Sequence, residues 1–162
     1  MKAKSTPKGY HSLTPYIAVE DVAKAVDFYK TVFGATEIIK REMGGRVLLA
    51  GLLIGDSHLM ISDLANEGGS APERIDEPKY SGVRVYLDDV DAAFARALAA
   101  GATQVSAVED QFYGDRVGTL IDPFGNAWRL SQHLEDLSGD EIERRMVAHG
   151  GRSQRMSGAS RE

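Results

Sequence analysis

The sequence predicts an α+β protein made of two successive β-α-β-β-β modules, each with one helix packed on a small sheet. A partial internal repeat indicates the duplication, because Val19-Glu20-Asp21-Val22 recurs as Leu87-Asp88-Asp89-Val90 and Gly34-Ala35-Thr36 recurs as Gly101-Ala102-Thr103. Strand-like runs separated by turn residues follow each predicted helix. Two such sheets side by side form a cup with their uncovered faces, and a cup of this kind is suited to a small molecule.

The first module begins with an apolar strand that ends at Tyr16 to Val19, and a helix follows that Asp21 caps and Gly34 ends. One face of this helix is apolar and carries Val22, Val26, Tyr29 and Phe33. Three strand-like runs come next, at Thr36 to Arg41, Arg46 to Ile54 and His58 to Ser62. The pairs Gly44-Gly45 and Gly55-Asp56 between them are typical of hairpin turns.

The second module repeats this order, with a strand at Val83 to Leu87 and a helix capped by Asp89. The apolar face of this helix carries Val90, Phe94, Ala97 and Leu98. The following strands are predicted at Gln104 to Val108, Val117 to Ile121 and Ala127 to Ser131. Asp122-Pro123-Phe124-Gly125 fits a type I turn between the last two, and Trp128 falls on the helix side of its strand, where we expect it to join the core.

The chain is expected to divide into a body at 10–135 and a C-terminal helix at 136–148, with flexible tails at 1–9 and 149–162. Within the body, module one covers 10–63, a linker rich in Gly, Pro and charge covers 64–79, and module two covers 80–135. Ser138 and Glu141 form a capping box that opens the C-terminal helix. We expect this helix to pack on the body or on a second subunit.

Composition excludes several classes of function. Nineteen basic residues against 24 acidic ones, with a pI near 5.4, argue against electrostatic binding to nucleic acid or to an anionic membrane. The chain has no cysteine, which excludes disulfides and thiolate metal sites. No apolar run approaches the length of a membrane span, and residues 1–9 lack the hydrophobic stretch of a signal peptide. A soluble, cytoplasmic protein whose partner is a small molecule or another protein is expected.

Several motifs within residues 10–135 resemble the vicinal oxygen chelate superfamily, which includes glyoxalase I, extradiol dioxygenases, fosfomycin resistance proteins and bleomycin-binding proteins. The motifs are Thr14-Pro15-Tyr16, the helix end from Phe28-Tyr29 to Phe33-Gly34-Ala35, and Gly114-Asp115-Arg116 followed by Asp122-Pro123-Phe124-Gly125. Within the superfamily they look like the PhnB-like subgroup. The resemblance implies the glyoxalase/bleomycin resistance fold, paired modules commonly joined in a homodimer, and a small-molecule site inside the cup.

The resemblance also implies where a divalent metal would be held in metal-using members, by His or Glu on the first and last strands of each module. These positions fall on Thr14, Met60, Gly82 and Arg129. None offers the expected ligand, and a guanidinium repels a divalent cation. We therefore predict no cofactor and no standard metal site. A divalent metal would need non-standard ligands such as His58, His133 and Asp63, whose spacing carries no motif.

Strand alternation, in which residues two apart share a face, indicates what lines the cup instead. The predicted ligand-binding residues are Thr14, Tyr16, Met60, Arg84, Tyr86, Phe112, Tyr113, Arg129 and Ser131. Two arginines near phenols suit a carboxylate, a phosphonate or an aromatic ligand. Alternatively, each arginine pairs across strands with Glu109 or Asp115. The segment from Phe112 to Arg116 is predicted to be a hairpin connection. Its two aromatics, Phe112 and Tyr113, either wall the cavity, pack against a partner subunit, or serve only in the turn and its packing.

Two classes of function follow from these residues. The first is a homodimeric, metal-free protein that binds an anionic or aromatic organic molecule. The alternative is an enzyme of the superfamily, a lyase, isomerase or dioxygenase, with either a relocated metal or a metal-free arginine and histidine site. His58 is the candidate for proton transfer in that case, because a neutral imidazole can act near pH 7. Metal-dependent glyoxalase I activity is not expected, since that reaction needs the metal to polarise the substrate.

Overall fold

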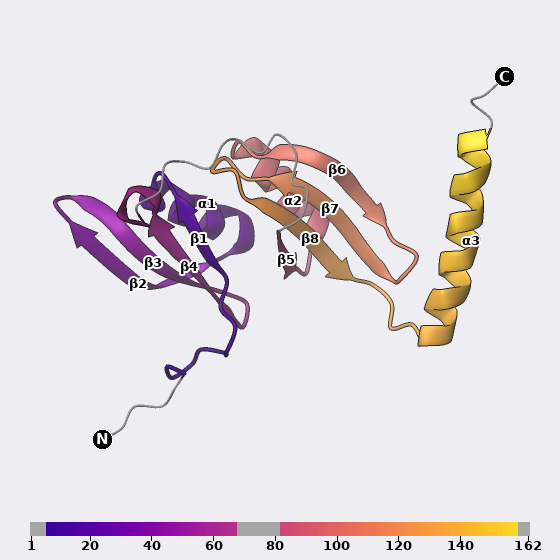
Figure 1. The fold of residues 1–162 in the computed structure, drawn as a ribbon, viewed down its shortest axis with the longest axis horizontal. Helices are drawn as coiled ribbons and strands as arrows, with labels where there is room; N and C mark the ends of the chain where they lie inside the picture. Colours follow the sequence, from indigo (N-terminus) through magenta and orange to yellow (C-terminus); the bar gives the residue numbers. More distant parts are fainter. Residues whose placement is uncertain (1–5, 68–81, 159–162) are drawn as a thin grey trace.

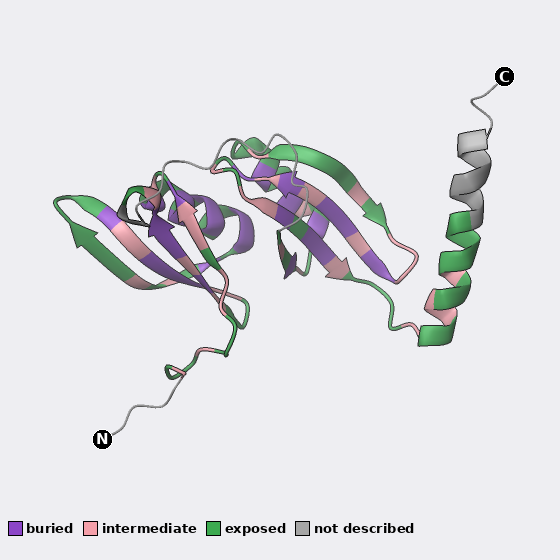
Figure 2. Cartoon of the chain, in the orientation of Figure 1, coloured by how far each residue is buried: buried purple, intermediate pink, exposed green. Residues whose placement is uncertain are grey.

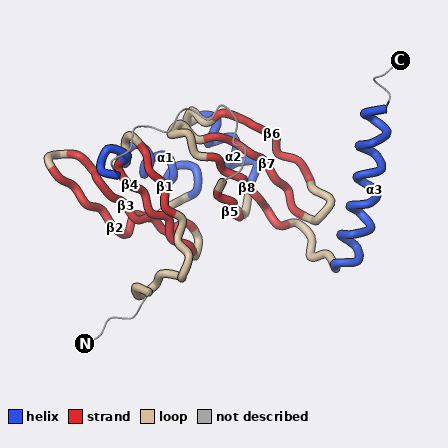
Figure 3. The backbone as a smooth tube through the Cα atoms, viewed as in Figure 1, coloured by secondary structure: helices blue, strands red, loops and turns tan. Residues whose placement is uncertain are grey.

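The computed structural model describes residues 6–67 and 82–158 and contains two four-stranded mixed sheets, each with one helix against it (Figures 1 and 3). The strand orders are β1-β4-β3-β2 and β5-β8-β7-β6, so the two sheets have the same topology. The α+β class and the duplicated β-α-β-β-β unit predicted from the sequence are therefore confirmed.

The first module contains β1 (Tyr16–Val19), α1 (Val22–Phe33), β2 (Thr36–Met43), β3 (Arg46–Ile54) and β4 (Ser57–Asp63). Asp21 caps α1 by accepting a hydrogen bond from the Lys24 backbone N–H at 3.1 Å, and Gly34 ends it in the left-handed conformation, with φ of 66°. A short 3-10 helix (Leu64–Glu67) occupies the start of the predicted linker. The rest of that linker lies outside the described residues.

The second module contains β5 (Val83–Tyr86), α2 (Val90–Ala99), β6 (Thr103–Asp110), β7 (Asp115–Ile121) and β8 (Ala127–His133). Asp89 caps α2 through the Ala92 backbone N–H at 2.9 Å, as the repeat predicts. The strands β7 and β8 run further than expected, because their pairing continues to Asp115 opposite His133. The longer pairing places two ionisable side chains, those of Asp115 and His133, opposite each other at the end of the β7–β8 ladder.

Each helix covers one face of its own sheet and buries most of the apolar side chains. Helix α1 packs on β3 and β4, and α2 packs on β6, β7 and β8. Trp128 is 1% exposed and belongs to the core, as predicted. Buried positions gather on the helices and the inner strands, whereas β2 and β6 are mostly exposed (Figure 2). Gly118 lets α2 approach, since a Cβ atom there would lie 2.8 Å from the ring of Phe94. Among residues 6–67 and 82–158, no helix covers the opposite face of either sheet.

A buried carboxylate joins the two modules. Asp122, in the turn between β7 and β8, is 4% exposed. Its side chain accepts hydrogen bonds from the Tyr29 hydroxyl of α1 at 2.5 Å and from the Trp128 indole N–H at 2.8 Å. Burial and the neighbouring Asp122 charge raise the pKa of Tyr29, so the phenol stays protonated and acts as a donor. On the adjacent surface, Arg96 of α2 donates to the Val32 carbonyl of α1 at 3.1 Å.

Helix α3 (Gly139–Gly158) stands at the far end of the molecule from the first module (Figure 1). Ser138 accepts from the Glu141 backbone N–H at 3.3 Å, which agrees with the predicted cap. The helix continues to Gly158 and does not end at Ala148, so it includes most of the segment predicted as a C-terminal tail. Residues 1–5 and 159–162 of the predicted tails lie outside the described residues. No helix among the described residues is long and apolar enough to cross a membrane.

Candidate functional site

The uncovered faces of the two sheets differ in chemistry. On the first sheet Tyr16 pairs with Met60, and the same face carries partly buried Leu49 and Leu53. On the second sheet Arg84 pairs with Arg129, and Tyr86 pairs with Ser131. Partners in register share a face, so the first sheet offers an apolar surface and the second a polar, cationic one.

Four side chains on the second sheet and its β6–β7 hairpin meet in what we call the arginine–tyrosine cluster, made of Arg84, Tyr86, Tyr113 and Arg129. Arg84 donates to the Tyr86 hydroxyl oxygen at 3.1 Å and to the Tyr113 hydroxyl oxygen at 3.3 Å. Arg129 donates to the same Tyr113 oxygen at 3.1 Å. Two cationic groups therefore converge on one neutral phenol.

Asp115 lies beneath this cluster and is 4% exposed. It accepts from the Tyr86 hydroxyl at 3.1 Å, and its Oδ2 is 3.8 Å from Nη1 of Arg84. Arg84 therefore forms the ion pair with Asp115 that the alternative interpretation of the sequence predicted. Arg129 differs, because no carboxylate of the described residues lies within ion-pair distance of its guanidinium.

Backbone contacts at the β6–β7 hairpin place Tyr113 over the two arginines. Gly114 has a φ of 93°, and its carbonyl accepts from the backbone N–H groups of Leu134 and Glu135. A Cβ atom at this glycine would lie 2.6 Å from the Glu135 carbonyl oxygen, so no other residue fits without movement. Phe112 packs edge-on against Tyr113, with ring centroids 5.2 Å apart, and also contacts His149 of α3.

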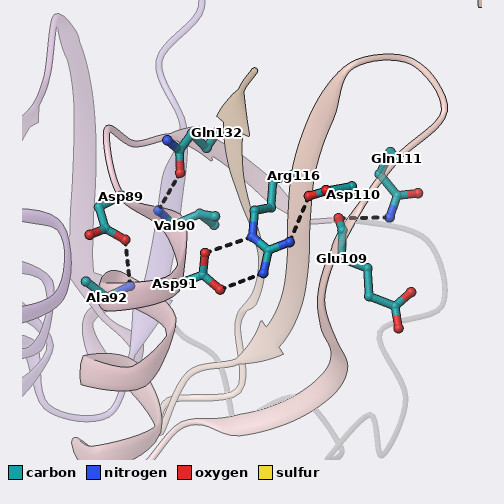
Figure 4. A network of polar contacts seen from close by, with 9 residues as sticks. All are labelled: Asp89, Val90, Asp91, Ala92, Glu109, Asp110, Gln111, Arg116 and Gln132. Atoms are coloured by element: carbon teal, nitrogen blue, oxygen red, sulfur yellow. Dashed lines mark hydrogen bonds and ion pairs between the residues drawn. The ribbon is translucent and has the colours of Figure 1, made fainter. Parts of the chain in front are cut away.

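Arg116 fastens the same hairpin from the helix side of β7 (Figure 4). Its guanidinium donates to both carboxylate oxygens of Asp91 in α2, at 2.7 and 2.9 Å, and to Asp110 at the end of β6, at 2.7 Å. Hydrogen bonding to Arg116 lowers the pKa of Asp91. Each residue of the Gly114-Asp115-Arg116 motif therefore has its own role. Gly114 forms the turn, Asp115 is a buried anion on the open face, and Arg116 connects the hairpin to α2 on the helix face.

A cavity of about 340 Å³ lies between the modules, next to the arginine–tyrosine cluster. Four of the predicted site residues line it: Thr14, His58, Arg84 and Tyr86. Its apolar wall includes Leu59, Val85 and Trp128. Sequence reasoning missed Leu13 and the hairpin residues Asp56 and Ser57, which line the cavity together with His11. These residues lie just before the strands predicted to end at Val19 and to begin at His58, and this position was the sequence signal that could have identified them.

The other predicted residues lie outside this cavity lining. Tyr16 is half exposed on the first sheet, and Met60 is partly buried beside it. Phe112, Tyr113 and Arg129 lie on or near the second sheet, as described above. Ser131 is 0% exposed, and its hydroxyl has no hydrogen-bond partner among the described residues. A ligand reaches Ser131 only if neighbouring side chains move.

His58 occupies the first-module side of the cavity. Its ring stacks on Tyr10, with centroids 4.0 Å apart and an interplanar angle of 23°. Its Nδ1 is buried and has no hydrogen-bond partner within the described part of the chain. A role for His58 in proton transfer stays a prediction.

The residues at the metal-ligand positions do not fit a divalent cation. Thr14, Met60, Gly82 and Arg129 offer one hydroxyl, one thioether, no side chain and one positive charge. Within residues 6–67 and 82–158, no group of three or more His, Asp or Glu side chains is placed to hold a metal. The non-standard set considered from the sequence is separated, because His58 stacks on Tyr10, Asp63 pairs with Arg46, and His133 contacts Asp115.

Solved structures of other proteins share this fold. The X-ray structure of an Arabidopsis thaliana gene product superposes with a TM-score of 0.59 at 30% identity, covering 75% of this chain and 98% of that one. A mutant of the fosfomycin resistance protein FosX from Listeria monocytogenes, complexed with Mn(II) and 1S,2S-dihydroxypropylphosphonic acid, gives a TM-score of 0.57 at 19% identity, covering 83% of this chain and 97% of that one. At 19% identity, the similarity to FosX shows a shared fold and nothing further.

Sequence comparison identifies the family. An uncharacterized protein of Mycobacterium tuberculosis is 39% identical over 145 residues, which cover 86% of this chain and 84% of that protein. An uncharacterized protein of Arabidopsis thaliana is 31% identical over 137 residues, which cover 78% and 81%. The model of the family described as the Glyoxalase/Bleomycin resistance protein/Dioxygenase superfamily matches residues 10–130. The two β-α-β-β-β modules and this match together show that the chain belongs to the glyoxalase/bleomycin resistance protein/dioxygenase superfamily.

Proposed function

We propose that this protein binds a small organic anion without a metal ion. The acidic group of the ligand contacts Arg84 and Arg129, and its apolar part occupies the cavity between the modules. One observation carries the proposal: two guanidinium groups converge on the Tyr113 hydroxyl, while Asp115 is the one carboxylate of the described residues within ion-pair distance of either.

Charge balance favours an anion at this position. The Nη2 atoms of Arg84 and Arg129 contact the same oxygen at 3.3 and 3.1 Å, so the two cations repel each other at short range. Asp115 offsets one of these charges. A carboxylate or phosphonate beside Tyr113 would offset the other positive charge. It would also accept hydrogen bonds from the guanidinium N–H groups that do not donate to the phenols.

The cavity favours a ligand with an apolar body. Its volume of about 340 Å³ is at the lower end of small-molecule sites. Val85, Leu59 and Trp128 provide an apolar wall, and Arg84 belongs to both the cavity and the arginine–tyrosine cluster. An aromatic or branched aliphatic acid fits both features.

Calorimetric titration with matched probes tests the proposal. We expect benzoate and phenylphosphonate to bind chelator-treated protein, and we expect the neutral analogue benzamide to bind at least about tenfold more weakly, because it cannot form the charge-assisted hydrogen bonds. Adding zinc or manganese should leave the affinities unchanged. Equal binding of benzoate and benzamide, or binding that appears only with metal, would contradict the proposal.

We also propose assignment to the PhnB-like subgroup. The supporting residues are those of the two motifs in the second module. Gly114 and Asp115 build the hairpin turn and the anion beneath the cluster, whereas Asp122 joins the modules. The first motif therefore positions the candidate site, and the second holds the two modules together.

A homodimer is the assembly we propose. Two apolar surfaces support it: the uncovered face of the first sheet, where Tyr16 is 49% exposed, and α3, where Met146 and Val147 are 51% and 69% exposed. We expect light scattering after size exclusion to give twice the chain mass of 17.6 kDa. The mass of a single chain at every accessible concentration would exclude the dimer.

A further inference from the structure

A chain of hydrogen bonds connects an exposed histidine to the arginine–tyrosine cluster. His133, at the end of β8, contacts Asp115 Oδ1 through Nδ1 at 2.8 Å. The other oxygen of Asp115 accepts from the Tyr86 hydroxyl at 3.1 Å, which in turn accepts from Arg84 at 3.1 Å. Asp115 therefore lies between an imidazole that can gain a positive charge and the guanidinium of Arg84.

The contacts of His133 favour its charged form. Its Nε2 lies 2.9 Å from Asp136 Oδ1, so both ring nitrogens face carboxylate oxygens. A neutral imidazole has one N–H and can donate to one of these oxygens, whereas an imidazolium donates to both. Hydrogen bonds to Asp115 and then to Asp136 raise the pKa of His133.

We propose that His133 is a positioning residue that makes anion binding depend on pH, by controlling how strongly Asp115 competes with the ligand for Arg84. This inference rests on the proposed function, because it concerns affinity at the same cluster. When His133 is charged, it balances Asp115, and Arg84 is available to an incoming acid. When His133 is neutral, Arg84 alone balances Asp115, whose Oδ2 is 3.8 Å away.

Other charged groups near this series of hydrogen bonds do not duplicate the effect of His133 on Arg84. On β6, Glu109 lies beside Val117 on the same open face, and among the described residues it forms no ion pair with Arg84 or Arg129. On the side of α3, Glu135 is paired with Arg145 at 3.0 Å, and that arginine also contacts Glu141. Tyr113 accepts hydrogen bonds from Arg84 and Arg129, and within the described residues neither Tyr113 nor Arg129 forms a hydrogen bond with Asp115 or His133.

The sign of the pH dependence follows directly. The folded-state pKa of His133 is raised, so its charge is complete at low pH and is lost as pH rises through that pKa. Losing the charge adds negative potential at the cluster and draws Arg84 toward Asp115. Anion affinity therefore falls as pH rises, by about fivefold for a charge several ångströms away in a partly solvated site.

Side-chain NMR on the labelled full-length chain tests the coupling without a ligand. We expect the Arg84 Nε–Hε signal to shift with the same midpoint as the His133 ring. In Asp136→Asn, both midpoints should move together to lower pH, because one of the two carboxylates that raise the His133 pKa is gone. In His133→Asn, whose amide can still donate to Asp115, the Arg84 transition should vanish.

The affinity of benzoate, followed over the same pH range, completes the test. Wild type should lose about fivefold across the transition, and His133→Asn should show a flat profile. An Arg84 signal that does not follow His133, or an equal pH dependence in both proteins, would overturn the inference. Absence of benzoate binding at every pH would instead overturn the proposed function, and the Arg84 signal would still decide whether His133 acts through Asp115.

Discussion

Replacing Asp122 with alanine is expected to lower the free energy of unfolding by about 3–5 kcal/mol, because several buried donors lose their acceptor at once. The carboxylate accepts from the Tyr29 hydroxyl and the Trp128 indole, which are 0% and 1% exposed. It also accepts from the backbone N–H groups of Phe124 and Asn126, both at 2.9 Å. The variant would leave these groups without partners where water cannot replace the acceptor.

Urea denaturation followed by circular dichroism measures this effect. Asp56→Ala serves as the control, because Asp56 is an exposed turn aspartate whose side chain accepts from Ser57. We expect the control to change stability by no more than about 0.5 kcal/mol. A loss below about 1 kcal/mol in Asp122→Ala would show that the junction between the modules does not depend on this carboxylate.

Replacing Arg129 with glutamine is expected to weaken benzoate binding by about 10- to 100-fold, which corresponds to the loss of one charge-assisted contact. Arg129 is the better target of the two arginines, because Arg84 also interacts with Asp115 and Tyr86. The Arg129 side chain contacts Tyr113 at the surface, so its removal should leave the fold intact. Arg129→Lys should recover part of the affinity, since the charge returns without the bidentate geometry.

Calorimetry on the same preparations separates a local effect from a change in net charge. Arg41→Gln removes the same charge from the exposed strand β2, where Arg41 donates to a backbone carbonyl. Its affinity should match that of wild type. If Arg41→Gln and Arg129→Gln weaken benzoate equally, the attraction is a long-range one and the arginine–tyrosine cluster is not the site.

Local signals in the sequence were sufficient to predict the fold. The caps at Asp21 and Asp89 and the glycine at position 34 act within one turn of chain, so their effect can be inferred without tertiary contacts. The end of α3 could not be predicted in this way. The helix was predicted to end at Ala148, but the structure continues it to Gly158, through Gly150 and Gly151.

Strand alternation predicted part of the site. It placed Arg84 and Arg129 on one face, and the register confirms that they are neighbours. It could not predict that Tyr113 bridges them, because the path of a hairpin loop depends on backbone contacts such as those of Gly114. Likewise, Asp122 fitted a turn in the sequence, and its contact with Tyr29 depends on the packing of one module against the other.

The most direct test of anion binding by the arginine–tyrosine cluster is a crystal structure with 4-bromobenzoate, in which anomalous scattering locates the bromine. We predict that the carboxylate contacts Arg84 and Arg129 beside Tyr113, with the bromine in the cavity between the modules and no metal between ligand and protein. A bromine elsewhere, or a carboxylate held by a metal ion, would contradict the account.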